Sequence, residues 1–205
     1  MSMQSIFTCG FLIAMQFAMA PAYGQELPRP HQLVRDSADQ VLELSRSIDG
    51  IDDINDADVQ NLLELLDPIV GFRQIARAVI GDHSDELNAE QIQRFTSTFR
   101  NAMTRFYLES LVTFDLQSVA VIPPENTDET DDQARVRVEA EDGAGKHYDL
   151  DYLLRVDTNN DWQVLNMVID GVNLGASYRS QFDSAMDTYN DADKVIANWR
   201  NDGEG

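Results

Sequence analysis

The spacing of apolar residues changes twice along the chain. Up to residue 114, apolar residues recur three or four positions apart, as on one face of an amphipathic helix. From 116 to 170 they alternate with polar residues, which is typical of strands with one buried and one solvated face. After Gly171 the helical repeat returns. The pattern predicts an α+β domain in which several amphipathic helices pack on one curved, four-stranded antiparallel sheet.

Start and stop residues bound the predicted helices. Two prolines within 25–30 favour an extended lead-in before the first helix. Pro68 ends or kinks the second helix, Gly81 is a C-terminal cap for the third, and Asn88 or a neighbour caps the fourth. The predicted helices span 31–49, 59–66, 72–80, 88–114 and 174–189, with a short last segment around 195–199.

Turn-forming residues separate the predicted strands. Prolines at 123–124, glycines within 142–145 and asparagines at 159–160 mark the three turns. On the third strand Tyr152 lies on the buried face, whereas Asp151 faces solvent near arginines of the second strand, where ion pairing is expected. The predicted strands span 116–122, 134–140, 147–156 and 162–170.

The first 24 residues have the features of a secretion signal. Residues 6–19 are almost continuously apolar and uncharged, and the run is shorter than the about 20 residues that a membrane-spanning helix needs. Small side chains at Ala22 and Gly24 stand where a signal peptidase reads the chain. We therefore predict a signal peptide over 1–24 and a single domain over 25–205, which is 205 − 24 = 181 residues. A buried N-terminal helix is the alternative.

The net charge and the cysteine content limit which partners and which reactions are possible for this chain. The chain has 15 basic and 36 acidic residues and a net charge of −21, which excludes nucleic acid as a partner and disfavours long residence on an anionic membrane. The acidity serves either solubility or docking to basic patches on a partner protein. Cys9 lies in the predicted signal, so the mature domain has no disulfide and no thiol chemistry.

No catalytic or metal-binding motif emerges. The three histidines, His31, His83 and His147, are far apart in sequence and stand in no known catalytic pattern. The acidic segments 52–58 and 157–162 imitate calcium loops but lack the complete ligand pattern. We therefore expect no enzyme activity, no metal and no cofactor. Large apolar side chains on the inner faces fit either a filled core or an apolar pocket.

Three stretches resemble the MlaC family of toluene-tolerance or Mla-type auxiliary proteins. Residues 91–100, with Tyr107 downstream, are similar to the family's QRxxFxxxFR…Y helix. Residues 162–174 are similar to its W+VxDVxIEGVSL strand, and 178–182 to the YRSQF opening of the next helix. The likeness covers most of residues 30–200 and implies the same α+β fold around an apolar pocket.

The resemblance implies a periplasmic carrier with bound phospholipid as cargo. In this family, lipid moves between an outer-membrane lipoprotein/porin complex and an inner-membrane ABC transporter with a lipid-binding ring subunit, which maintains outer-membrane lipid asymmetry. Gly71 and His83 stand where the family usually has aspartate and an aromatic residue, so another hydrophobic cargo such as a hopanoid stays open. A periplasmic adaptor that binds only proteins is the alternative from another class. We expect a monomer.

On this resemblance we assign a wall for the acyl tails and a site for the headgroup phosphate. The wall candidates are Phe95, Phe99, Met103, Tyr107, Tyr148, Tyr152, Val168 and Tyr178. The headgroup candidates are Arg100, Arg105 and Arg179. The alternative for each wall residue is plain core packing, and the alternative for each arginine is a surface ion pair.

Overall fold

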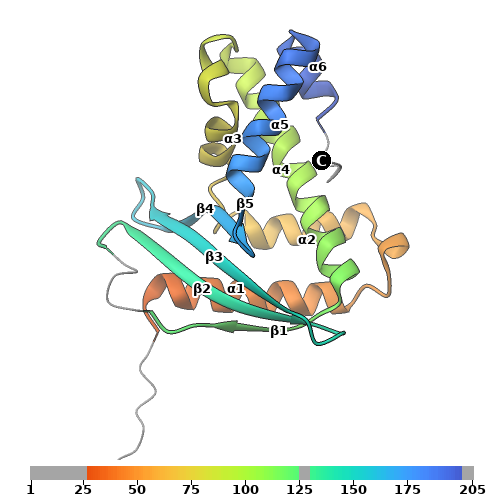
Figure 1. Cartoon of the computed structure of the whole chain (residues 1–205), viewed down its shortest axis with the longest axis vertical. Coiled ribbons are helices and arrows are strands. Elements are labelled where there is room, and N and C mark those ends of the chain that lie inside the picture. Colours follow the sequence, from red (N-terminus) through yellow and green to blue (C-terminus); the bar gives the residue numbers. More distant parts are fainter. Residues whose placement is uncertain (1–26, 125–129, 200–205) are drawn as a thin grey trace, which may run out of the picture.

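The computed structural model describes residues 27–124 and 130–199 (Figure 1), so the predicted signal peptide lies outside the described residues. The helices are α1 (Arg29–Arg46), α2 (Asp56–Leu66), α3 (Phe72–Ile80), α4 (Ala89–Phe114), α5 (Leu174–Tyr189) and α6 (Ala192–Ala197). Short 3₁₀ helices lie at Ile51–Asp53 and Gly81–Asp85. The strands are β1 (Leu116–Val121), β2 (Gln133–Asp142), β3 (His147–Val156), β4 (Trp162–Ile169) and β5 (Val172–Asn173).

The sheet is an antiparallel meander in the order β1-β2-β3-β4-β5, which confirms the α+β class. The prediction of four strands was wrong by one, because the chain folds back on itself after β4. Asp170 and Gly171 have φ angles of 48° and 84°. Two positive φ angles in a two-residue loop are the geometry of a tight hairpin turn. The turn places Val172 opposite Ile169, which creates β5.

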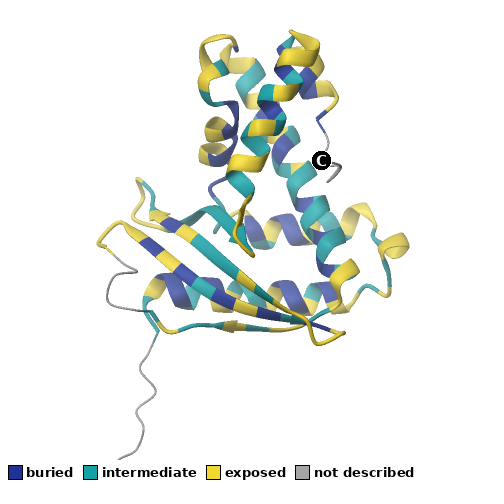
Figure 2. Ribbon diagram, viewed as in Figure 1, coloured by how far each residue is buried: buried dark blue, intermediate teal, exposed yellow. Residues whose placement is uncertain are grey.

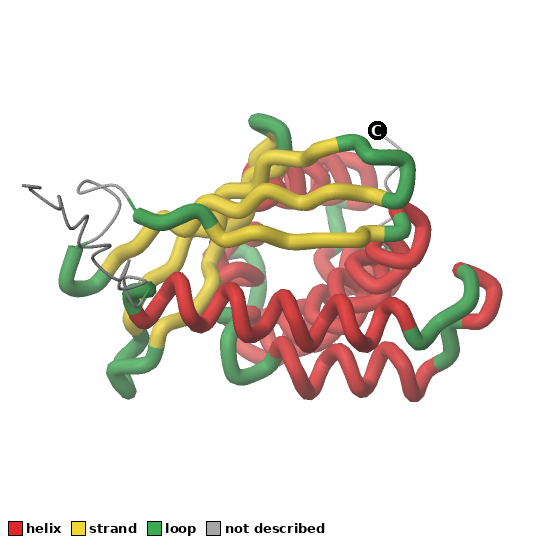
Figure 3. Tube along the Cα trace, turned by 90° about the horizontal axis from the view of Figure 1, so that it is seen from below, coloured by secondary structure: helices red, strands yellow, loops and turns green. Residues whose placement is uncertain are grey.

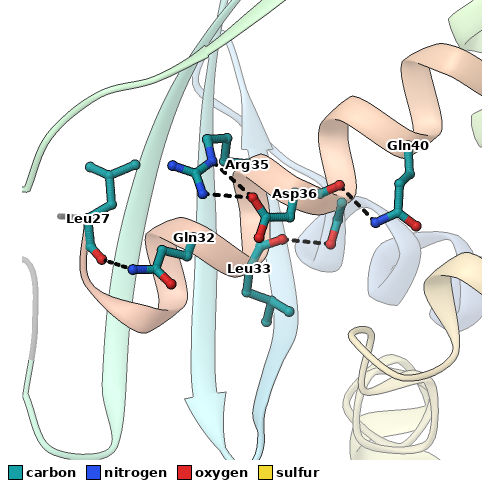
Figure 4. Close-up of polar contacts among 7 residues, drawn as sticks. Leu27, Gln32, Leu33, Arg35, Asp36 and Gln40 are labelled. Carbon is teal, nitrogen blue, oxygen red and sulfur yellow. Dashed lines mark hydrogen bonds and ion pairs between the residues drawn. The ribbon is translucent and has the colours of Figure 1, made fainter.

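The first helix begins earlier than its prolines suggested. α1 starts at Arg29 and includes Pro30 in its first turn, where the missing N–H is not needed by the helix. The side chain of Gln32 donates a hydrogen bond to the carbonyl oxygen of Leu27 at 2.5 Å and ties the lead-in to the helix (Figure 4). The extended conformation predicted up to residue 30 therefore ends before the helix starts at Arg29.

The helices divide between two parts of the molecule. α1 and α2 lie along one face of the sheet, whereas α3, α5, α6 and the start of α4 form a helical end beyond it (Figures 1 and 3). The two parts are joined at β4, where the Gly71 N–H donates to the Val164 carbonyl oxygen at 3.0 Å. A Cβ on Gly71 would lie 2.5 Å from Leu165 Cδ2, so a larger residue here would have to displace the Leu165 side chain. None of the described helices is both long and apolar enough to cross a bilayer.

Buried apolar residues form three clusters, and β2 shows the alternation that fills one of them (Figure 2). The aromatic core, at the helical end, contains Ile75, Ala76, Val79, Ile80, Leu87, Phe95, Phe99, Phe182, Met186, Ala192, Val195, Ile196 and Trp199. The helix core contains Val41, Leu62, Leu63, Leu66, Phe72, Leu108 and Leu111. The sheet core contains Val34, Ala134, Val136, Val138 and Leu154.

Candidate functional site

The candidate residues on α4 fall into two groups, one in each half of the helix. α4 begins with a capping box in which Asn88 Oδ1 accepts from the Gln91 N–H and Gln91 Oε1 accepts from the Asn88 N–H, both at 2.9 Å. The helix is 26 residues long and reaches from the helical end to the sheet. Phe95 and Phe99 lie in its N-terminal half and Tyr107 in its C-terminal half, so they meet different neighbours.

Phe95 and Phe99 are fully buried in the aromatic core. The ring of Phe95 meets Phe182 edge-on at 4.9 Å and Trp199 edge-on at 5.1 Å. Phe99 meets Tyr178 edge-on at 5.3 Å, and burial raises the pKa of Tyr178 to about 12. Edge-to-face contacts at these distances are those of a filled core. These three wall candidates therefore pack against other aromatic rings.

Met103, Tyr107 and Tyr152 lie where the helix core approaches the sheet core. Met103 packs against both the aromatic core and the helix core, Tyr107 against the helix core, and Tyr152 against the sheet core. All three side chains are only half-buried. Burial nevertheless raises the pKa of Tyr107 and, together with the Tyr107 hydroxyl, raises the pKa of Tyr152 well above its usual value. These tyrosines are thus surrounded by protein without being tightly covered.

The two hydroxyl groups interact. Their side-chain interaction partly offsets the effect of burial on the pKa of Tyr107 and further raises the pKa of Tyr152. This interaction links α4 to β3 at the junction of the two cores. We call Met103, Tyr107 and Tyr152, with the residues of β3 and β4 beside them, the junction.

The inner face of β3 and β4 completes the junction. Met167 lies opposite Tyr152 in the ladder, and Ile169 lies opposite Leu150. β4 is half-buried at every one of its eight positions, whereas β2 alternates between buried and exposed residues in the ordinary way. A sheet face turned toward a packed helix normally becomes fully buried. Large apolar side chains at the junction are therefore incompletely covered by the rest of the chain.

Tyr148 lies on the same face of β3 as Tyr152 but near the start of the strand. Its hydroxyl donates to Asp142 Oδ2 at 2.9 Å, and its ring lies 5.7 Å from that of Phe114. Backbone N–H groups of Lys146 and Ala144 and the Tyr148 hydroxyl lower the pKa of Asp142 despite its burial. Tyr148 is thus fixed at one end of the sheet, away from Tyr107.

A β-bulge moves Val168 away from the candidate wall. The ladder between β3 and β4 pairs Leu154 with Val164 and Leu153 with Asn166, which leaves Leu165 as an extra residue. One extra residue reverses which side chains face inward beyond it. Val168 consequently lies opposite Asp151, on the face away from Tyr152. Val168 was assigned to the wall on the family resemblance, and in the structure it lies on the opposite face of the sheet from Tyr152.

Each headgroup candidate forms an ion pair with an aspartate. Arg100 also lies over the ring of Phe72, with its guanidinium carbon 5.9 Å from the ring centre. The pairs are Arg100–Asp67, Arg105–Asp56 at 2.5 Å and Arg179–Asp82 at 2.7 Å. The arrangement is the surface ion pair that the sequence left as the alternative. On the solvent face of the sheet, Arg135 and Asp151 pair at 2.7 Å, as predicted.

An open cavity of about 320 Å³ lies between α3, β4 and the start of α5, away from the junction. Its lining residues are Ile75, Ala78, Val79, Leu165, Asn166, Asn173, Gly175, Ala176 and Arg179. Asn166 Oδ1 accepts from the Gly175 N–H at 3.0 Å, and Asn173 Oδ1 accepts from the Asn166 side chain at 2.9 Å and from the Ala176 N–H at 3.0 Å. The strand and helix motifs that carry the family resemblance therefore meet here and hold the start of α5.

No group of three or more histidine, cysteine or acidic side chains that could hold a metal ion occurs within 27–124 and 130–199. The calcium-like segment after β3 has a structural use. Asp157 Oδ1 accepts hydrogen bonds from the backbone N–H groups of Asn159 at 2.8 Å and Asp161 at 2.9 Å. This carboxylate closes the hairpin turn that the sequence predicted.

Three residues at or beside the junction were not among the candidates. Leu150 could have been found, because it lies between Tyr148 and Tyr152 in the strand alternation. Ile169 lies beyond the β-bulge in β4, and strict alternation from Trp162 would place it on the other face of the sheet. Thr104 is fully buried on α4, and its polarity gave no signal for a place inside the molecule.

Comparison with known proteins places the chain in a family. The family model described as MlaC protein matches residues 35–201. The toluene tolerance protein ttg2D of Pseudomonas putida is 28% identical over 200 residues, which cover 96% of this chain and 91% of that protein. A phospholipid-binding protein from Ralstonia solanacearum, solved in complex with a phospholipid, shares the fold with a TM-score of 0.67 at 22% identity, over 82% of this chain and 92% of that one. Since the family model spans most of the sequence, this chain belongs to the MlaC family.

Proposed function

We propose that this protein is a periplasmic carrier that holds the acyl tails of a phospholipid at the junction. The tails lie between the C-terminal half of α4 and the inner face of β3 and β4. The carrier shuttles its lipid between an outer-membrane complex and an inner-membrane ABC transporter. Phe95, Phe99 and Tyr178 serve as core, and Val168 is left out of the wall.

One observation carries the proposal: facing elements present large apolar side chains that the chain itself covers incompletely. Met103 and Tyr107 on α4, and Leu150, Tyr152 and Met167 on the sheet, are all half-buried. Leucine and methionine are among the residues most often fully buried in a close-packed interior, so their partial exposure here leaves apolar surface uncovered. A cargo with long apolar chains supplies the missing cover. The phospholipid in the related Ralstonia structure supports this choice of cargo.

The energetics of lipid transfer require such a carrier. Each methylene exposed to water costs about 0.8 kcal/mol, so the roughly 30 groups of a diacyl lipid amount to about 20 kcal/mol or more. Free diffusion between two membranes is then negligible. A binding site of this kind requires apolar walls and no catalytic residue.

The test is native mass spectrometry of the mature chain purified without detergent, with lipid extraction in parallel. Leu150→Trp places a bulky ring at the junction and is expected to lower the bound lipid severalfold while the fold remains. Leu153→Trp is the matched control, because Leu153 is 37% exposed on the other face of the same strand. Equal lipid loading of the two variants would place the tails elsewhere.

The same measurement separates the alternatives. A folded wild-type chain with no bound lipid would favour the adaptor function. A bound mass that matches a hopanoid or another apolar compound would retain the carrier function and change the cargo. Shuttling itself is tested by transfer of labelled lipid between vesicles that carry the two partner complexes.

A further inference from the structure

Thr104 is a buried hydroxyl without a hydrogen-bond partner among the described residues. It is 0% exposed, and its Oγ1 meets no acceptor or donor. A threonine or serine within a helix either points to solvent or donates to the carbonyl oxygen four residues earlier. Thr96 and Ser110 on the same helix do so, each at 2.8 Å. A hydroxyl left unsatisfied in the interior is unfavourable, so its presence calls for a ligand or a partner that arrives later.

The position of Thr104 links it to the tyrosine pair. Thr104 precedes Tyr107 by three residues, so the two side chains are neighbours on one face of α4, with Cβ atoms about 5–6 Å apart. The side chains of Tyr107 and Tyr152 interact with each other, and a tyrosine hydroxyl can both donate and accept hydrogen bonds. Met103 and Leu108, the adjoining residues on this part of the helix, carry no hydrogen-bond donor. Thr104 and Tyr107 thus place two hydroxyl-bearing side chains on the same stretch of α4, and Tyr107 in turn interacts with Tyr152 of β3.

We propose that Thr104, Tyr107 and Tyr152 form a hydroxyl subsite that binds the ester carbonyl oxygens of an acyl lipid. The inference rests on the proposed function and specifies which part of the lipid lies at the tyrosine pair. An ester carbonyl accepts hydrogen bonds and cannot donate them, and the hydroxyls of Thr104 and Tyr107 can donate. Hydrocarbon tails gain nothing from a buried hydroxyl, whereas the carbonyl oxygens at the head of each tail satisfy it.

The subsite predicts a preference for ester-linked over ether-linked lipid. The mature chain is delipidated and loaded from an equimolar mixture of diester phosphatidylethanolamine and its diether analogue, with equal chain lengths. Because a neutral hydrogen bond is worth about threefold to tenfold in binding, we expect an excess of that size of diester lipid in the native mass spectrum. Thr104→Val keeps the shape and removes the hydroxyl, so its diester excess should shrink toward one.

Thr96→Val is the matched control, because Thr96 is already satisfied by the Ile92 carbonyl oxygen. It should keep the wild-type excess. If Thr104→Val does not fold, Tyr107→Phe makes the same test. Equal loading of the two lipids by the wild type, or an unchanged excess in both Thr104→Val and Tyr107→Phe, would overturn the subsite. Failure to load either lipid would instead overturn the carrier function.

Discussion

Truncation of Phe95 distinguishes a core residue from a wall residue. Phe95 is 0% exposed and has three ring neighbours, Phe182 at 4.9 Å, Trp199 at 5.1 Å and Phe99 at 5.7 Å. Phe95→Leu keeps most of the apolar volume and removes these ring contacts, each worth about 0.5–1.5 kcal/mol beyond area burial. We expect the free energy of unfolding to fall by about 2 kcal/mol. Phe95→Ala also leaves a cavity and should lower it by about 3–5 kcal/mol.

Urea unfolding followed by tryptophan fluorescence measures both changes, because Trp199 touches the altered site. Phe114→Leu is the control on the same helix: Phe114 is 50% exposed, so its change should stay within about 0.5 kcal/mol. Lipid content is measured on the same samples and should not change in Phe95→Leu. A stability loss below about 1 kcal/mol, combined with lost lipid, would show that Phe95 lines the cargo site and would refute the assignment to core.

Two further predictions concern pH and backbone conformation. Burial raises the pKa of Tyr178 to about 12, so the folded chain keeps this hydroxyl protonated after the unfolded chain ionises near pH 10. The free energy of unfolding therefore falls by up to about 3 kcal/mol as the pH rises from 10 to 12. Urea unfolding at several pH values should show a smaller fall for Tyr178→Phe. An identical pH profile for the two proteins would contradict the assignment of this fall to Tyr178. Gly81 has φ of 53° and its Cβ would lie 2.8 Å from the Arg179 guanidinium, so Gly81→Ala should destabilise by about 1–3 kcal/mol in thermal unfolding. Gly50→Ala is the control and should not destabilise the protein, because its Cβ would lie 3.7 Å from the nearest atom, Asp53 Oδ2. Equal changes in the unfolding temperature of the two variants would argue against strain at Gly81.

The sequence predicted elements best where a periodic pattern ran long. β3 has both of its predicted bounds, 147 and 156, because apolar and charged residues alternate over most of its ten residues. β5 was missed because two residues carry no period. The bulge at Leu165 was missed because Leu165 and Val164 are both apolar, so the extra residue leaves no break in the composition. Short local features of this kind depend on pairing and turn geometry rather than on hydrophobicity.

The site was harder to predict than the fold, because one helix face meets two environments. Phe95 and Tyr107 belong to the same apolar pattern of α4, yet Phe95 is packed by rings from α5 and the C-terminal segment. These partners, Phe182 and Trp199, lie 182 − 95 = 87 and 199 − 95 = 104 residues further along the chain. Tyr107 meets the sheet instead and is only half-buried. Whether a residue belongs to the core or to the wall of a pocket depends on how much space the side chains of distant elements fill around it. The local sequence pattern does not give this information.

The arginines show the same limit in electrostatic form. Arg100, Arg105 and Arg179 find aspartates that are 33, 49 and 97 residues away in sequence. With 36 acidic and 15 basic residues, an arginine at this surface has an acidic neighbour close by in most places, so ion pairing was the simpler expectation. Exposed pairs of this kind contribute little to stability, and their main effect is to satisfy the positive charge. A headgroup phosphate would have to compete with an aspartate at each of them.

A carrier must keep its fold when its cargo leaves, and the distribution of packing in this chain provides for that. The helical end is filled by aromatic rings and is fixed to β4 through Gly71, whose Cβ position is already occupied by Leu165. At the junction, by contrast, large apolar side chains of α4 and the sheet are only half-buried, and Tyr107 of α4 interacts there with Tyr152 of β3. Regions with few tight contacts open at low free energy, whereas a close-packed core resists opening. Under the proposed function, exchange of lipid would therefore move the sheet against the C-terminal half of α4 and leave the aromatic core unchanged.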